Sequence, residues 1–164
     1  MHSWKLRPIP KPKRVILFLV TGAGAGYFPW FPGTAGTLVA VPLSLALNRI
    51  ASTSLSLALL TLAAFVATAV WLATKGEEMF HEKDSPRIVI DEIAGFLLGD
   101  FLSPAEFAPG AAAFILFRFF DIIKPYPAGR AEKISGGLGV VMDDLIAGLY
   151  TFVILRVLLY AGFL

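Results

Sequence analysis

Cysteine is absent from this sequence of 164 residues, and charged residues make up only 16% of it. The missing cysteines exclude disulfide bonds and thiolate metal sites, but they leave the redox compartment open. The low charge separates the chain from ordinary soluble domains, in which about a quarter of the residues are charged. With 57% hydrophobic residues and a mean hydropathy of +0.74, the sequence instead predicts an integral membrane protein.

The sequence also lacks a basic face with interleaved aromatic residues, so we do not expect nucleic acid as a partner. Its net charge is only +2. The lysines and arginines are therefore more informative about membrane orientation than about binding.

Five apolar stretches predict an all-α fold, a polytopic bundle with about five membrane helices, some of them short. They cover residues 37–50 (interrupted by Pro42), 53–74, 88–101, 106–121 and 139–164. Residues 15–30 contain an apolar run too short to cross a bilayer, so we expect an interfacial or re-entrant segment there. Residues 75–87 are charged and predict a loop or a short surface helix. We expect one membrane-embedded domain over residues 1–164, with residues 1–14 as a basic arm.

Basic residues are distributed unequally between the two predicted membrane faces. Arg49 lies alone on one face, whereas the other carries eleven, namely Lys5, Arg7, Lys11, Lys13, Arg14, Lys75, Lys83, Arg87, Lys124, Arg130 and Lys133. Because lysine and arginine are enriched in cytoplasmic loops, the richer face is predicted to be cytoplasmic.

Two acidic pairs are each followed by the same small-residue pattern. Asp91-Glu92 precedes Ile-Ala-Gly, and Asp143-Asp144 precedes Leu-Ile-Ala-Gly, so each pair has a glycine one helical turn later. Small residues allow helices to approach closely. The predicted topology places both pairs on the cytoplasmic face, together with Asp121 at the end of another apolar stretch.

These five carboxylates predict a site for a divalent cation. Unpaired, they would repel one another at an apolar boundary. Oxygen ligands without cysteine favour Mg²⁺ over zinc, so Asp91, Glu92, Asp121, Asp143 and Asp144 are the candidate metal ligands. Two alternatives remain open at this point: structural ion pairs with Arg118, Lys124 and Arg130, or an ion pathway through a cation- or proton-coupled transporter.

Two further motifs predict phosphate binding. Arg118, Asp121 and Lys124 share one side of a helix because they follow one another at intervals of three residues. The segment from Pro32 to Leu38 is expected to be a glycine and threonine turn that opens a helix, where free N–H groups and hydroxyls suit a phosphate. Its candidate residues are Gly33, Thr34, Gly36 and Thr37. A simple helix cap is the alternative, since the segment lacks the lysine of a P-loop.

Together these motifs resemble the phosphatidylglycerophosphatase A family of bacterial membrane phosphatases. The resemblance rests on Pro32-Gly33-Thr34-Ala35-Gly36-Thr37-Leu38, Asp84, Ile88-Val89-Ile90-Asp91-Glu92, Gly95, Phe117-Arg118, Asp121, Lys124-Pro125, Pro127, Gly137, Gly139, Asp143-Asp144 and Ala147-Gly148. It extends over most of the chain, from about residue 22 to residue 150.

The resemblance implies a Mg²⁺-dependent phosphatase of phospholipid biosynthesis in the bacterial inner membrane, with its active site facing the cytoplasm. It would convert phosphatidylglycerophosphate to phosphatidylglycerol and phosphate. The expected catalytic residues are Asp91, Glu92, Asp121, Lys124, Asp143 and Asp144, with Arg118 and Lys124 on the phosphate oxygens. The nucleophile is left open between an activated water and a carboxylate that forms an aspartyl phosphate. The small-residue faces are also compatible with a homo-oligomer.

Overall fold

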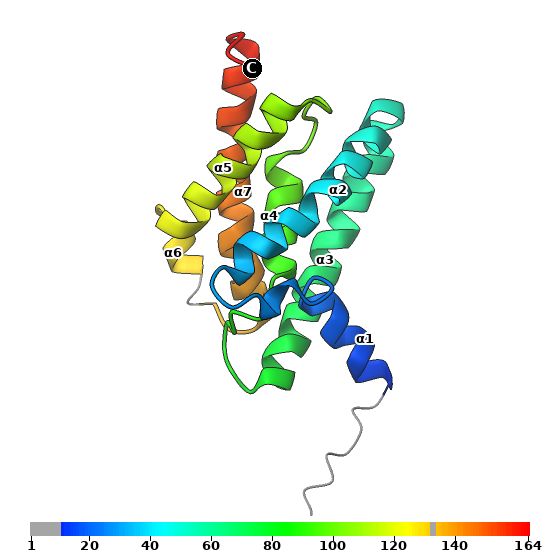
Figure 1. Cartoon of the computed structure of the whole chain (residues 1–164), viewed down its shortest axis with the longest axis vertical. Helices are drawn as coiled ribbons and strands as arrows, with labels where there is room; N and C mark the ends of the chain where they lie inside the picture. Colours follow the sequence, from blue (N-terminus) through cyan, green and yellow to red (C-terminus); the bar gives the residue numbers. More distant parts are fainter. Residues whose placement is uncertain (1–10, 132–133) are drawn as a thin grey trace, which may run out of the picture.

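The computed structural model describes residues 11–131 and 134–164. Within these ranges the chain forms helices and no strand, which confirms the all-α prediction (Figure 1). The elements are α1 (Lys11–Val20), the 3-10 helix η1 (Ala25–Tyr27), α2 (Pro32–Thr53), α3 (Leu55–Phe80), α4 (Ile90–Gly99), α5 (Phe107–Ile123), α6 (Ala128–Ala131) and α7 (Gly137–Tyr160). Residues 1–10 of the predicted basic arm, and Lys133, lie outside the described residues.

Within the described part of the chain, three helices, α2, α3 and α7, are long and apolar enough to cross a membrane. Helix α5 has 17 residues and α4 only 10, and the expectation of about five membrane helices, some short, is compatible with this set. Helix α1 also has 10 residues, which at about 1.5 Å per residue is too short to cross a bilayer core about 30 Å thick.

Two predicted boundaries are wrong. Helix α2 begins at Pro32, and it continues through Pro42 instead of being interrupted there. Proline suits the first helical position because no N–H is needed there, and membrane helices tolerate an internal proline. Helix α3 continues to Phe80, into the segment predicted as a loop or a short surface helix, and ends where His81 adopts a left-handed conformation.

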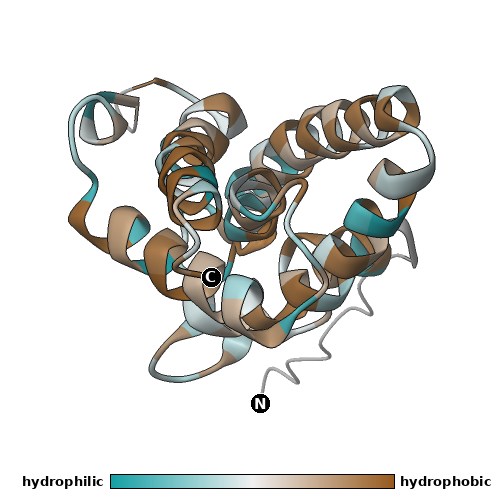
Figure 2. Cartoon of the chain, turned by 90° about the horizontal axis from the view of Figure 1, so that it is seen from above, coloured by the Kyte–Doolittle hydropathy of each residue, from teal (hydrophilic) through white to brown (hydrophobic). Residues whose placement is uncertain are grey.

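Helix α4 lies at the centre of the bundle. It packs against α2, α3, α5 and α7, and nearly all of its residues are buried. The long helices around it present many exposed leucines, valines and phenylalanines, and they appear largely hydrophobic when the bundle is viewed from above (Figure 2). An apolar exterior of this kind is expected of helices that face lipid.

A polar network closes the end of the bundle where α4 finishes. The Ser44 hydroxyl and the Asn48 amide donate hydrogen bonds to the buried Asp100 carboxylate and to its carbonyl oxygen, respectively. Asn48 also accepts from the Leu102 N–H at 2.8 Å, and Arg156 donates to the Leu102 carbonyl oxygen at 2.6 Å. The turn after α4 is thereby tied to α2 and α7.

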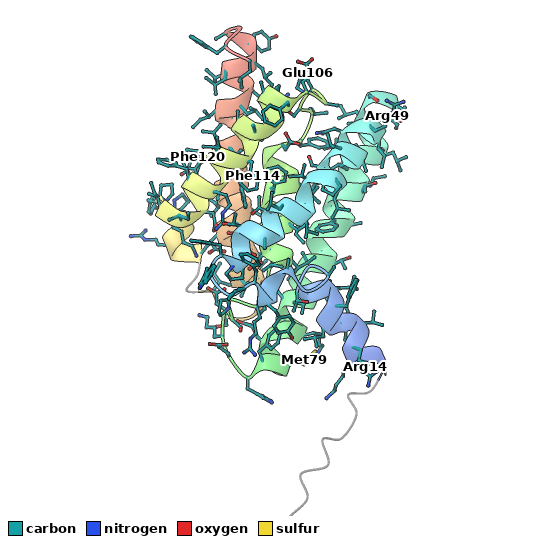
Figure 3. All side chains as sticks on the ribbon, in the orientation of Figure 1. Arg14, Arg49, Met79, Glu106, Phe114 and Phe120 are labelled. Atoms are coloured by element: carbon teal, nitrogen blue, oxygen red, sulfur yellow. The ribbon has the colours of Figure 1, made fainter. Side chains whose placement is uncertain are left out.

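Charged residues lie at both ends of the long axis of the bundle. Figure 3 shows Arg49 and Glu106 at one end, and Arg14 and Met79 at the other. Arg49 therefore lies at the end opposite to Arg14, as the predicted distribution of basic residues requires.

Candidate active site

The starts of α4 and α7 place three carboxylates together. Asp91 and Glu92 lie in the first turn of α4, and Asp144 lies near the start of α7. One carboxylate oxygen from each of these residues lies within 4.8 Å of the others. Asp91 and Asp144 are buried and Glu92 is half-buried. Three of the five predicted metal ligands therefore form one compact group.

Glycines bring these carboxylates together. Helices α4 and α7 form the most extensive packing between two elements of the described chain. A Cβ added to Gly95 would press on the carbonyl oxygen of Asp144, and one added to Gly148 would overlap the carbonyl oxygen of Gly95. The predicted close approach of the two helices at these glycines is thus confirmed.

The end of α5 contributes Arg118 and Asp121 to the edge of this group. The Arg118 Nη1 atom lies 2.7 Å from the Asp121 Oδ2 atom, in an ion pair that is largely shielded from solvent. Asp121 is also within electrostatic reach of Glu92 and Asp144. Arg118 therefore sits among carboxylates from α4, α5 and α7, where its charge offsets part of their repulsion.

Lys124 and Asp143 form the second ion pair of the site. The Lys124 Nζ atom lies 2.6 Å from the Asp143 Oδ2 atom, and the Asp143 side chain is only 5% exposed. Lys124 ends α5 in a left-handed conformation, which turns the chain after the helix. Asp121 and Asp143 are thus placed beside the compact group and are each held by a cation.

The predicted phosphate-binding segment has a different form from the one expected. Residues 33–37 lie in the first turns of α2 instead of in a turn before it. Gly33 leaves the space that Glu92 and Arg118 occupy, and Gly36 packs against Val89. Thr34 is half-buried. Gly36 therefore serves helix packing, whereas Gly33 borders the site.

Thr37 connects α2 to α5 at the edge of the site. Its hydroxyl donates to the Gly33 carbonyl oxygen at 2.9 Å and accepts a long hydrogen bond, 3.4 Å, from the Arg118 Nη1 atom. Thr37 is completely buried. Its partner in the site is Arg118, so Thr37 is placed to position the Arg118 side chain.

Asp84, for which the sequence motifs predict no specific role, belongs to the same electrostatic environment. It follows α3 in a loop and has a left-handed conformation, and its N–H donates to the Glu77 carboxylate at 3.0 Å. Its charge acts on both Asp91 and Asp143. Asp84 lies seven residues before Asp91 in the sequence. This spacing did not predict their proximity, because most of the residues between them form a loop and not a regular helix.

The donor set fits a divalent cation. Five acids lie together with two cationic side chains, and the buried Glu92 Oε2 and Asp143 Oδ1 atoms have no hydrogen-bond partner among the described residues. Buried carboxylate oxygens without a partner are costly unless a cation compensates them. Hard oxygen ligands of this kind suit Mg²⁺.

Comparisons with known proteins match most of the chain to a described family. The profile of the family described as phosphatidylglycerophosphatase A matches residues 18–159. A putative phosphatidylinositol-3-phosphatase of Bacteroides thetaiotaomicron is 36% identical over 90% of this chain and 95% of its own length. A phosphatidylglycerophosphatase A of Haemophilus influenzae is 31% identical over 88% of this chain and 89% of its own length.

A third relative, a phosphatidylglycerophosphatase A of Escherichia coli, is 30% identical over 79% of this chain and 75% of its own length. No solved structure gives a significant match. The family match spans all the predicted site residues, from Gly33 to Asp144. The chain therefore belongs to the phosphatidylglycerophosphatase A family of phosphatases.

Proposed function

We propose that this protein hydrolyses the terminal phosphomonoester of phosphatidylglycerophosphate, releasing phosphatidylglycerol and inorganic phosphate, in a Mg²⁺-dependent reaction. The observation that carries the proposal is the convergence of Asp91, Glu92 and Asp144 beside Arg118. A group of carboxylates beside a guanidinium suits a phosphate together with the metal that neutralises it.

Asp91, Glu92 and Asp144 would hold the cation, with Asp121 and Asp143 as further candidate ligands. Bound Mg²⁺ would polarise the phosphoryl oxygens and lower the pKa of a nearby water. The carboxylates themselves orient the reacting groups and can accept the proton that the attacking water loses.

Arg118 and Lys124 are the candidate phosphate-binding cations. The Arg118 Nε atom is buried and has no hydrogen-bond partner within the described ranges, so it can still donate to a substrate oxygen. The N–H groups of Gly33 and Thr34, in the first turn of α2, have no acceptor within their own helix and lie at its positive end. Together with Arg118 and Lys124, these N–H groups would bind the phosphate beside the carboxylates.

The reaction breaks the bond between phosphorus and the glycerol oxygen. Attack by water on phosphorus would release phosphate and the leaving alcohol. The water loses one proton, and the leaving oxygen takes up one proton to become the alcohol. In the alternative route a carboxylate attacks first, and water then hydrolyses the resulting aspartyl phosphate. Acid quench during turnover of ³²P-labelled substrate, followed by peptide mapping, would separate the two routes, because only the second leaves labelled phosphate on a carboxylate.

The membrane orientation belongs to the same proposal. The site lies at the starts of α4 and α7, toward the end of the bundle where Figure 3 shows Arg14, and Arg49 lies toward the other end. This asymmetry supports a site that opens to the cytoplasm of a bacterial inner membrane. Only the terminal phosphate of the lipid would need to enter it, while the acyl chains stay in the apolar layer.

A phosphorylated inositol lipid is the second candidate substrate, because the Bacteroides relative carries a name of that kind and shares 36% identity. Both substrates present a phosphomonoester on a diacyl lipid, so the carboxylates and cations described above would act on either. The two substrates differ in the alcohol from which the phosphate is removed, a glycerol in one and an inositol in the other.

The test is phosphate release by the detergent-purified protein from phosphatidylglycerophosphate, phosphatidylinositol phosphate and phosphatidic acid, each with Mg²⁺ and with EDTA. We expect release that requires Mg²⁺ and is fastest with phosphatidylglycerophosphate. Faster release from the inositol lipid would transfer the assignment to the second candidate. Ion flux through reconstituted vesicles without any hydrolysis would instead favour the transporter.

A further inference from the structure

An apolar cavity of about 550 Å³ lies between α2 and α5, away from the carboxylate group. Helix α2 lines it with Leu38, Val41 and Leu45, and α5 lines it with Ala111, Phe114 and Ile115. The volume is that of a ligand site, since small-molecule pockets measure about 300–1,000 Å³.

The cavity begins where the candidate phosphate site ends. Leu38 directly follows Thr37 on α2, and Phe114 lies one helical turn before Arg118 on α5. The hydrogen bond from Arg118 to Thr37 joins the two helices at this point. Beyond it α2 and α5 have few contacts with each other, so an open groove runs away from the polar site.

The absence of a side chain at Gly110 helps to keep the groove open. Gly110 lines the cavity, and a Cβ added to it would meet no atom within 4 Å. Glycine in a helix interior costs about 0.5–1 kcal/mol relative to alanine, so its presence in α5 has no benefit for the helix itself.

The dimensions of the groove suit one lipid chain. Its lining residues extend about 10 Å along α2, from Leu38 to Leu45, and about 12 Å along α5, from Phe107 to Ile115, at about 1.5 Å per residue. Arg118 lies about one helical turn beyond this lining. Half of the hydrocarbon core of a bilayer is about 15 Å thick. A chain that starts at Arg118 would therefore run through about one leaflet.

The charges at the two ends of the groove give it a direction. Arg118 lies just beyond one end, one helical turn after Phe114, and Glu106 lines the opposite end, toward the end of the bundle that carries Arg49 (Figure 3). An anionic head group is attracted to the first end and repelled from the second. A lipid phosphate combines a phosphomonoester with an apolar chain of this length, and it therefore matches both the charge beside the groove and its apolar lining.

We propose that the groove between α2 and α5 binds one acyl chain of the diacyl lipid phosphate while its head group lies among Arg118, Lys124 and the carboxylates. This inference rests on the proposed function and adds to it the site that positions the lipid. Because an acyl chain leaves one apolar environment for another, the groove contributes orientation more than affinity.

The first experiment fills the groove with Gly110→Phe. Ala64→Phe is the matched control, because Ala64 is an exposed apolar position on α3, outside the groove. The substrates are dipalmitoyl phosphatidylglycerophosphate and the same head group without acyl chains. We expect Gly110→Phe to lower kcat/KM about tenfold for the lipid and less than about twofold for the deacylated compound. Ala64→Phe should change neither value.

Unchanged lipid hydrolysis by Gly110→Phe would overturn the proposal, and so would an equal loss with both substrates, since that result places the effect in the polar site. The wild-type protein provides a second measurement that does not depend on turnover. In nanodiscs, a phosphatidylglycerophosphate with a photoreactive acyl chain should label peptides of α2 and α5.

Unlabelled phosphatidylglycerophosphate should compete with this labelling, and phosphatidylcholine of the same chain length should not. Equal competition by both lipids would mean that the groove holds bulk lipid, and the proposal would fail. If the wild type hydrolyses no lipid but shows head-group-dependent labelling, the proposed hydrolysis fails and the lipid groove stands.

Discussion

The backbones of Gly95 and Gly148 pack directly against each other where α4 meets α7. Each glycine follows an acidic residue of the site by one helical turn, Asp91 in α4 and Asp144 in α7. The distance between the carboxylates is therefore set by the absence of two side chains.

Gly148→Ala should separate these helices. The added Cβ would overlap the carbonyl oxygen of Gly95, and neither backbone can move aside without repacking the bundle centre. We expect the free energy of unfolding to fall by about 1–3 kcal/mol. Thermal unfolding in detergent measures this, with Gly110→Ala as the matched control because its Cβ enters open space. An equal effect of the two substitutions would contradict the packing argument.

Asp144→Asn should abolish turnover while the protein stays folded. The side chain keeps its size but loses the charge that would bind the cation beside Asp91 and Glu92. We expect kcat/KM to fall by at least about 100-fold. Phosphate release and thermal unfolding should be measured together.

Asp100→Asn is the control for that experiment. Asp100 is also a buried aspartate, but it lies at the opposite end of α4, bonded to Ser44 and Asn48. Its substitution should lower stability and leave phosphate release within about threefold of wild type, because the lost interaction is structural. Near-normal turnover by Asp144→Asn would remove that residue from the site.

Thr37→Val should weaken substrate binding through Arg118. The substitution keeps the shape of the side chain but removes the hydroxyl that contacts the Arg118 Nη1 atom. A lost hydrogen bond of about 1 kcal/mol predicts a decrease of about fivefold in kcat/KM, mainly through KM. Thr37→Ser keeps the hydroxyl and should restore most of the loss. Equal defects in both variants would indicate that the methyl group matters instead.

Asp84→Asn should increase the Mg²⁺ concentration needed for half-maximal activity. Its negative charge acts on Asp91 and Asp143, so its removal makes the site less attractive to a cation. Groups next to a metal site typically change metal affinity by about 10–100-fold, and we expect the lower end here. The measurement is a Mg²⁺ titration of phosphate release.

Glu78→Gln is the matched control for the Mg²⁺ titration, because Glu78 is an exposed acid of α3 that pairs with Lys75. Exposed ion pairs contribute little, so its titration should follow that of the wild type. A parallel shift in both variants would show a general surface-charge effect and would exclude a specific role for Asp84.

Local sequence determined the helical elements and the identity of the charged groups. The apolar stretches exclude a soluble fold, and an acid or a base within such a stretch requires a partner wherever it lies. The repeated acid and glycine pattern at Asp91 and Asp144 further indicated close helix packing, since one turn of an α-helix fixes their relative position.

Only the tertiary structure decided which charges meet. The pairing of Lys124 with Asp143 and the hydrogen bond from Arg118 to Thr37 join residues from different helices, and the charge of Asp84 acts on the site from the loop after α3. The ion pair of Arg118 with Asp121, in contrast, lies within α5. Such contacts depend on how deeply each helix is buried and where helices cross, which no local pattern specifies. The short, central α4 and the groove beside α5 arise in the same way, because both depend on the space that several separate helices leave between them.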